Sequence, residues 1–276
     1  MFISQLFIYP VKSLGGIEVT TAQLGDRGFQ YDRRWMLVDE QNMFMTQRNH
    51  AHMALLQPTV AQHELIVNHK NILDEKISIP LDYNSSERIT VKVWDDQCEA
   101  IPMDSKINSW FSDILEMRCK LVYMPTDSLR KVDRDYAITD TDITSFSDAY
   151  PLLIIGQSSL DHLNSKLAQQ LPMNRFRPNI VFSGGKPHEE DEMEHFKVNT
   201  INFFGVKLCA RCVVTTINQD STQKGKEPLK TLASYRTRNS KIYFGQNLIH
   251  EGSGVVSVGD EIEIIKRKEP AVFTTA

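Results

Sequence analysis

VKLCARCVVTTINQD, residues 206–220, is the stretch that decides the fold. Apolar and β-branched side chains fill its first part, which predicts two consecutive strands over 206–211 and 212–217. Cys209 and Cys212 form a C-x-x-C inside this run. A thioredoxin-like dithiol needs that motif at the start of a helix in a βαβ unit. Its position in a strand-like run therefore favours a β-rich fold and argues against that class of protein.

The chain on both sides of this stretch is also strand-like. Residues 2–9 alternate between apolar and polar side chains, and residues 40–42 fit a hairpin turn. Further strands are expected at 34–39, 43–46, 64–69, 77–81, 89–96, 151–156, 179–184, 241–245 and 261–265.

Helical spacing is confined to three segments. A helix capped by Ser105 is expected to run to Leu115. A second is expected from Ser158 to Leu171, ended by Pro172, and a third, short helix is expected to have Pro228 at its first position. The fold class predicted is therefore mainly β with a few short helices (α+β).

The bulk properties fit a soluble globular protein with two domains. The chain has 276 residues, 24% of them charged, and a net charge of -4, so no basic surface argues for nucleic acid. No apolar run reaches the roughly 18 residues that span a bilayer. The start, MFISQLFIYPVKSLGG, lacks a basic leader and is predicted to be the first strand. We therefore expect no membrane contact and a cytoplasmic location.

A domain boundary is expected near residue 124. Residues 124–147 are polar and poorly periodic, which is typical of a connection between domains. The predicted organisation is a first domain over 1–123, a second over 124–265, and a tail or linker start over 266–276.

The C-x-x-C leaves three interpretations open. The chain has four cysteines, too few for a disulfide scaffold at this length. A zinc site needs more ligands than this motif offers. One thiolate could bind a soft metal that a cofactor supplies, and Arg211 beside it would favour the ionised thiol. The plain structural alternative is a buried, inert pair.

Two other segments are candidates for anion binding. Lys12 and Ser13 follow the first strand and precede Gly15-Gly16, where charge, a hydroxyl and a backbone N–H could receive a phosphate. Arg33, at the start of another strand, could pair with a phosphate in the same way. Each segment is equally compatible with a solvated loop or a local ion pair.

A third segment, Phe176-Arg177-Pro178-Asn179, combines a cation with an amide. Pro178 fixes the local backbone, so Arg177 and Asn179 project in defined directions into the next strand. An amide offers donors and acceptors that suit the edge of a heterocycle beside an anion. The alternative is a turn with a structural arginine.

Taken together, the segments resemble a known family, the MOSC-domain proteins that carry a MOSC N-terminal β-barrel domain. This group includes the mitochondrial amidoxime reducing component and YcbX-like bacterial proteins. The resemblance covers residues 1 to about 265. It rests on the ordered segments YPVKS, YDRRWMLVD, VWDD, FSDAYPLLII, NRFRPNIVFSG, CARCVVTTINQD, KEPLKTLASYR, FGQN and VSVGDEI.

The resemblance implies a molybdenum–molybdopterin cofactor between an N-terminal β-barrel-like domain and a MOSC β-barrel domain. Cys212 would be the catalytic residue and the protein ligand to molybdenum. The residues that would bind the rest of the cofactor are Lys12, Ser13 and Arg33 at the phosphate end, Asp148, Arg177 and Asn179 at the pterin, and Arg211 and Asn247 in the same cleft.

The activity implied is an oxidoreductase that reduces small N-hydroxylated substrates, converting N–OH to N–H and water. The alternative is a non-catalytic carrier or binding module for the cofactor or for sulfur. Asp220-Ser221-Thr222 departs from the Asp-Thr-Gly of many family members, which is expected to affect only a loop. The chain lacks the cysteines of the C-terminal [2Fe–2S] domain found in YcbX-like members. The electrons are therefore expected from a separate or downstream electron-donor protein, ferredoxin-like or a reductase.

Overall fold

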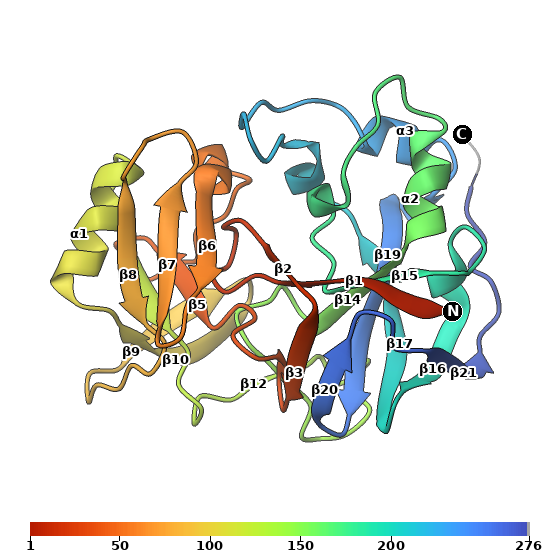
Figure 1. The fold of residues 1–276 in the computed structure, drawn as a ribbon, viewed down its shortest axis with the longest axis horizontal. Coiled ribbons are helices and arrows are strands. Elements are labelled where there is room, and N and C mark those ends of the chain that lie inside the picture. The colour runs from red at the N-terminus through yellow and green to blue at the C-terminus, as the bar shows by residue number, and fades with distance from the viewer. Residues whose placement is uncertain (275–276) are drawn as a thin grey trace.

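The computed structural model describes residues 1–274 and confirms a mainly β fold with few short helices (Figure 1). Its largest sheet has nine strands. In spatial order these are β2 (Ile17–Val19), β1 (Phe2–Ile8), β15 (Ile180–Ser183), β14 (Leu152–Gly156), β19 (Lys241–Glu251), β17 (Ile201–Ala210), β16 (Met193–Val198) and β21 (Ile262–Arg267), with β18 (Thr237–Arg238) also beside β19.

Apolar side chains form the core against this sheet, and in β1 they alternate with more exposed positions as the sequence predicts. Ile3 and Leu6 of β1 are fully buried and pack with Phe182, Phe196 and Phe203 from three other strands. Burying one such side chain contributes roughly 1.5–3 kcal/mol. Helices α2 (Gln157–Asn164) and α3 (Leu229–Ala233) lie against one end of the sheet (Figure 1).

The first half of the molecule, built by residues 35–123, has two smaller sheets and one helix, whereas the nine-stranded sheet forms the second half. One sheet orders β5 (Trp35–Val38), β11 (Lys120–Tyr123), β10 (Asp96–Pro102) and β9 (Ile89–Val93). The other orders β6 (Leu56–Val60), β7 (Glu64–His69) and β8 (Lys76–Pro80). Helix α1 (Ser105–Ile114) covers them, and its Ile107 and Phe111 join a core that includes Trp35.

The remaining elements tie these halves together. β3 (Thr21–Gly25) pairs with β4 (Gly28–Phe29) and with β20 (Gly254–Ser257), so the first thirty residues contribute strands to the sheets of the second half. β12 (Arg130–Lys131) and β13 (Ile143–Thr144) form a short pair. The 3₁₀ turns are η1 (Ala51–Leu55), η2 (Met173–Arg175), η3 (Glu189–Glu192) and η4 (Val213–Thr216).

The second half of the opening stretch is not a strand. Residues 213–216 form η4, because the hydroxyls of Thr215 and Thr216 donate back to the carbonyls of Cys212 and Val213 at 3.0 and 2.8 Å. The threonines that favoured a strand in the prediction thus hydrogen-bond to backbone carbonyls of their own turn. Cys212 consequently lies at the bend that follows β17.

The helix ends also differ from expectation. The carboxylate of Asp104, not Ser105, caps α1 by accepting from the Ile107 N–H at 2.9 Å. Helix α2 ends at Asn164 rather than near Leu171, because the Asn164 amide bonds both backbone groups of Leu171 and closes a loop. Pro228 precedes α3 instead of opening it. Within residues 1–274, no helix is long and apolar enough to cross a membrane.

Candidate functional site

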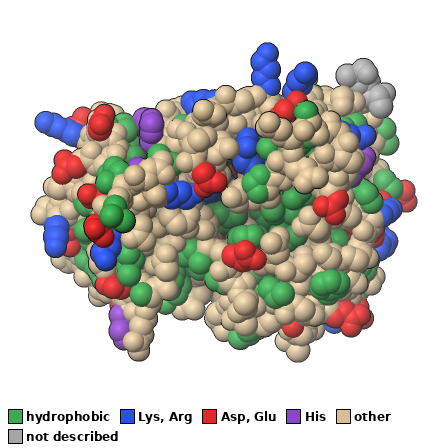
Figure 2. Space-filling model, turned by 45° about the horizontal axis from the view of Figure 1, so that its top comes forward, with side chains coloured by type: hydrophobic (Ala, Val, Ile, Leu, Met, Phe, Trp, Pro, Cys, Tyr) green, Lys and Arg blue, Asp and Glu red, His purple; other side chains and the backbone are tan. Residues whose placement is uncertain are grey.

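All nine residues predicted for the site line one cavity between the two halves. This cavity holds about 160 Å³, and Figure 2 shows basic side chains gathered at the hollow that separates the halves. The predicted residues on its wall are Lys12, Ser13, Arg33, Asp148, Arg177, Asn179, Arg211, Cys212 and Asn247. The structure therefore confirms that they are neighbours, while their individual roles stay predictions.

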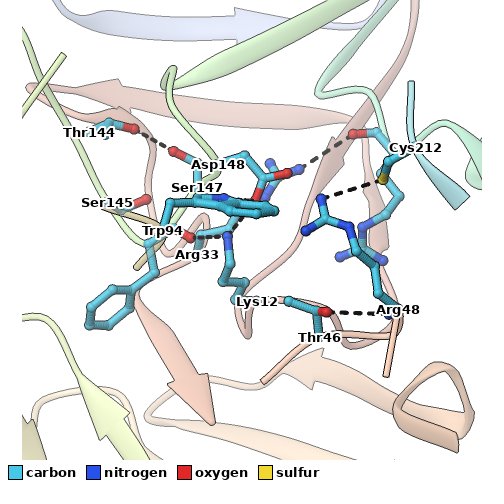
Figure 3. Close-up of polar contacts among 12 residues, drawn as sticks. Lys12, Arg33, Thr46, Arg48, Trp94, Thr144, Ser145, Ser147, Asp148 and Cys212 are labelled. Atoms are coloured by element: carbon cyan, nitrogen blue, oxygen red, sulfur yellow. Dashed lines mark hydrogen bonds and ion pairs between the residues drawn. The ribbon is translucent and has the colours of Figure 1, made fainter. Parts of the chain in front are cut away.

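Lys12 is a buried cation at the base of the cavity. It follows β1, and its Nζ donates to the carbonyl of Phe146 at 2.8 Å and to the carboxylate of Asp148 at 2.7 Å (Figure 3). Burial lowers the pKa of Lys12 to about 8, although the charge of Asp148 opposes that shift. The sequence gives no sign of this burial, since a lysine in a loop is ordinarily solvated.

The segment expected to be a loose connection positions Asp148. The buried Arg130, the first residue of β12, donates to the carbonyls of Ser145, Ser147 and Asp148 at 2.6 to 2.9 Å. Its Nε also bonds the carboxylate of Asp96 at 2.8 Å. Residues 145–148 are therefore held against the first half of the molecule, with the Asp148 side chain at the edge of the cavity.

Arg33 is held by two neighbours. Its Nη1 donates to Asp32 at 2.6 Å and to the Asn179 Oδ1 at 3.0 Å. The Asn179 Nδ2 donates in turn to Asp32 and to the carbonyl of Phe7. The amide of Asn179 is thus occupied inside the protein, so its visible role is to orient Arg33; direct contact with a pterin stays a prediction.

Tyr9 is a site residue that the sequence did not single out. The guanidinium carbons of Arg33 and Arg177 each lie 4.3 Å from the centre of its ring. Burial raises the pKa of Tyr9 to about 12 despite these cations, so the phenol stays neutral. Its hydroxyl is buried without a hydrogen-bond partner among the described residues.

Gly15 and Gly16 do not face the cavity as a phosphate cradle would. A Cβ on Gly16 would lie 2.4 Å from the Tyr9 ring, and one on Gly15 would lie 2.4 Å from the Gln57 side chain. Neither glycine lines the cavity with Lys12 and Ser13. Their small size serves the packing of Tyr9 and Gln57, which corrects the expectation of a glycine-assisted phosphate loop.

The two thiols of the C-x-x-C have different arginine neighbours. The Arg211 Nη1 donates to the Cys209 Sγ at 2.8 Å. The Cys212 Sγ accepts instead from the Arg48 Nη2 at 3.4 Å (Figure 3). Arg211 lines the same cavity as Cys212, as predicted, but its guanidinium donates to Cys209 and to the carbonyl of Phe176, so its influence on the Cys212 thiol stays a prediction.

The charges around the cavity are unbalanced. Six cations and one carboxylate line it. Lys12 pairs with Asp148, and Arg33 pairs with Asp32, which is buried behind it. Within residues 1–274 the other four make no ion pair with a carboxylate; these are Arg48, Arg175, Arg177 and Arg211. Such a wall favours an anionic ligand, since unpaired guanidiniums bind anions through several charge-assisted hydrogen bonds.

Sequence reasoning missed Arg48 and Arg175 in this wall. Arg48 comes from the loop after β5, far in sequence from Cys212. Arg175 belongs to η2, and its Nε donates to the carbonyl of Thr215 at 2.9 Å. Only the tertiary fold brings these side chains to the C-x-x-C, although the nearness of Arg175 to the Arg177-Pro178-Asn179 segment was a usable signal.

The other two cysteines lie outside this site, and the described residues offer no ligand set for zinc. Cys98 and Cys119 are buried elsewhere, where burial raises the pKa of each thiol to about 11. In the described part of the chain, no group of three or more His, Cys, Asp or Glu side chains could hold a metal ion. Cys212 and Cys209 are the thiols that line the cavity.

Comparisons with known proteins find matches over most of the chain. Residues 1–118 match the MOSC N-terminal beta barrel domain, and residues 141–263 match the MOSC domain. Mitochondrial amidoxime-reducing component 1 of Xenopus laevis is 28% identical, over 96% of this chain and 82% of the relative. Mitochondrial amidoxime-reducing component 1 of Mus musculus is 30% identical, over 95% and 82%.

A second kind of relative covers the chain as well. Molybdenum cofactor sulfurase of Oryza sativa subsp. japonica is 32% identical over 90% of this chain, but the match spans only 32% of that longer protein. The amidoxime-reducing components match along most of their length, 82% in each case. The chain therefore belongs to the family of two-domain MOSC proteins that includes the mitochondrial amidoxime-reducing components.

Proposed function

We propose that the chain binds a molybdenum–molybdopterin cofactor in this cavity and reduces small N-hydroxylated compounds. The observation that carries the proposal is the presence of a partly exposed thiol, Cys212, beside four guanidiniums that form no ion pair with a carboxylate among residues 1–274. A cofactor with a phosphate and an ene-dithiolate is anionic and brings a soft metal. It therefore fits both the charge and the sulfur of this donor set.

A buried hydrogen-bond donor in the cavity wall also fits such an anionic group. The Arg211 Nε is buried without a hydrogen-bond partner among the described residues. An unpaired buried donor costs roughly 1–3 kcal/mol, which a bound anion would recover. Lys12, Ser13 and Arg33 would hold the phosphate end, Arg177 and Asp148 the pterin, and Cys212 the metal, with Asn247 on the same wall.

The protein's part in the reaction is to bind and orient. Bound molybdenum would supply two-electron redox chemistry, and the overall change is R–NH–OH plus two electrons and two protons to R–NH₂ plus water. Asn179 and Tyr9 keep the guanidiniums of Arg33 and Arg177 in place. Lys12, whose pKa of about 8 lies near neutral pH, can hold or release a proton at Nζ beside Asp148.

Electrons would come from a separate or downstream electron-donor protein, ferredoxin-like or a reductase. A cytoplasmic location stays a prediction, since the matched amidoxime-reducing components carry a mitochondrial name. The test is reduction of a model amidoxime by the purified protein with reduced viologen dye. Stoichiometric formation of the amidine supports the proposal, and a molybdenum-loaded protein that forms no amidine contradicts it.

The alternative is a carrier or binding module for the cofactor or for sulfur. Two observations favour it: the 32% identity to a protein named as a sulfurase, and a second thiol, Cys209, on the same cavity wall. A carrier would release the cofactor to an acceptor protein and would leave the amidoxime unchanged. Retention of molybdenum through gel filtration together with amidoxime turnover would exclude it.

A further inference from the structure

Arg48 and Trp94 stand together where the cavity opens to solvent. Both come from the first half of the molecule, and Figure 3 shows them beside Asp148, with Arg48 extended toward Cys212. Trp94 is 39% exposed, and the Asp148 side chain is 67% exposed. Lys12 and Arg33, by contrast, lie deep in the cavity, with side chains 6% and 13% exposed. The open edge is therefore the side from which a substrate reaches Cys212.

Trp94 is fixed in an unusual position. It is the first residue of the two-residue turn between β9 and β10 and has a φ of 57°, which favours glycine at that place in a hairpin. A bulky residue there costs on the order of 1–3 kcal/mol. The strain is offset by contacts: the Trp94 Nε1 donates to Asp148 at 3.2 Å, and the Phe44 ring lies 5.0 Å away.

Arg48 lies over this indole and remains available to bind an anion. Its guanidinium carbon lies 4.2 Å from the centre of the Trp94 ring, and one N–H donates to the Cys212 Sγ. Among residues 1–274 it has no carboxylate partner. A guanidinium stacked on an aromatic ring keeps its in-plane N–H groups available for an anion.

The charges around Arg48 leave this edge positive. Asp148 is the one carboxylate that the described part of the chain places on the cavity wall, and it is already paired with Lys12. Lys224 lies next to Arg48, because its Nζ donates to the Arg48 carbonyl at 3.3 Å. Arg175, also without a carboxylate partner, lines the same cavity. A negative group that approaches Cys212 therefore meets more cations than carboxylates among the described residues, since Asp148 is already paired with Lys12.

We propose that Arg48, positioned by Trp94, is a specificity-determining residue that favours N-hydroxylated substrates carrying a negatively charged group. The inference rests on the proposed reductase function and adds to it the charge of the preferred substrate. The indole would hold the guanidinium in place at the cavity opening, and the guanidinium would bind the anionic group of the substrate. Both would act next to the thiol assigned to the metal.

The test uses two amidoximes of equal size, one bearing a carboxylate and the other the matching carboxamide. Arg48→Gln should lower the ratio of kcat/KM for the carboxylate substrate to kcat/KM for the carboxamide about tenfold or more, as expected when a charge-assisted hydrogen bond of roughly 1.5–3 kcal/mol is lost. Arg48→Lys should retain part of the preference. Arg134→Gln, which removes an exposed cation from the segment after β12, is the matched control.

Two further readouts separate this proposal from its alternatives. Molybdenum content per chain is measured in wild type, Arg48→Gln and Arg134→Gln, and kcat/KM is expressed per molybdenum, so that any loss of cofactor cancels from the ratio for the two substrates. Without an electron donor no turnover occurs, so the Kd of the carboxylate amidoxime can be measured by tryptophan fluorescence. It should rise in Arg48→Gln in parallel with the loss in kcat/KM. Trp94→Leu should weaken the carboxylate preference and remove most of the fluorescence change.

The proposal is overturned if Arg48→Gln affects both substrates equally, since Arg48 would then act only on the fold or on the thiol. A fall in molybdenum content with an unchanged carboxylate preference would also overturn it and would make Arg48 a cofactor-binding residue. Failure of the proposed function looks different. In that case neither amidoxime is reduced by any variant, and the comparison of Kd values still tests the preference of Arg48 for the anion.

Discussion

The buried charge of Lys12 predicts that removing it stabilises the protein without its cofactor. Lys12 has a pKa of about 8 in the folded chain, lowered by burial from an ordinary value of 10.5. The unfolded chain therefore holds this proton more tightly. This difference in the pKa of Lys12 between the folded and unfolded chain lowers the free energy of unfolding by about 3 kcal/mol at pH 7 and by about 1 kcal/mol at pH 10. Lys12→Met should remove this cost while keeping much of the apolar stem.

The assay is urea unfolding of cofactor-free wild type and Lys12→Met at pH 7 and pH 10. The variant should be more stable at pH 7, and the difference should shrink by roughly 2 kcal/mol at pH 10, because stability from the lowered pKa rises with pH between 8 and 10.5. The exposed Lys106 on α1 supplies the control, Lys106→Met. A difference between wild type and Lys12→Met that does not change with pH would refute the reasoning.

Three further predictions concern the support of the site and its electron supply. Asn179→Ala should lower the free energy of unfolding by about 2–4 kcal/mol, since it leaves Asp32 and its neighbours short of partners; unchanged denaturant midpoints would contradict this. Gly16→Ala should cost about 1–3 kcal/mol by displacing Tyr9, whereas Gly25→Ala, with no atom within 4 Å of its Cβ, should cost less; equal losses would exclude this packing role. The purified chain should not turn over an amidoxime with NADH alone, and direct NADH-driven turnover would reveal a second cofactor site.

Much of the fold could be predicted because strand periodicity is local. Residues 2–9, 64–69 and 151–156 alternate or bury their apolar side chains as their strands do in the structure. The strands at 21–25 and 254–257 were missed, because short strands pair across the whole chain and carry little pattern of their own. The turn at 213–216 was missed because threonine hydroxyls compete with a ladder that β-branched residues otherwise favour.

The sequence predicted which residues line the site better than it predicted the contacts they make there. The order of motifs along the chain predicts that Lys12, Arg33 and Cys212 share one site, and the three line one cavity in the structure. No local pattern could show that Arg48 would contact Cys212, because the two lie 164 residues apart. Nor could it show that Lys12 is buried, since burial depends on the packing of both halves. Hydrogen bonds between distant side chains are decided by the tertiary fold.

The most direct test of the central claim is the molybdenum and pterin content of purified wild type, Cys212→Ser and Cys209→Ser. If Cys212 holds the metal of a bound cofactor, wild type and Cys209→Ser should contain both, whereas Cys212→Ser should lose molybdenum and amidoxime reduction. Cys209→Ser should keep most of its activity. Equal loss of activity in both variants with molybdenum retained in each would point to a dithiol mechanism, and a wild-type protein without molybdenum or pterin would contradict the account.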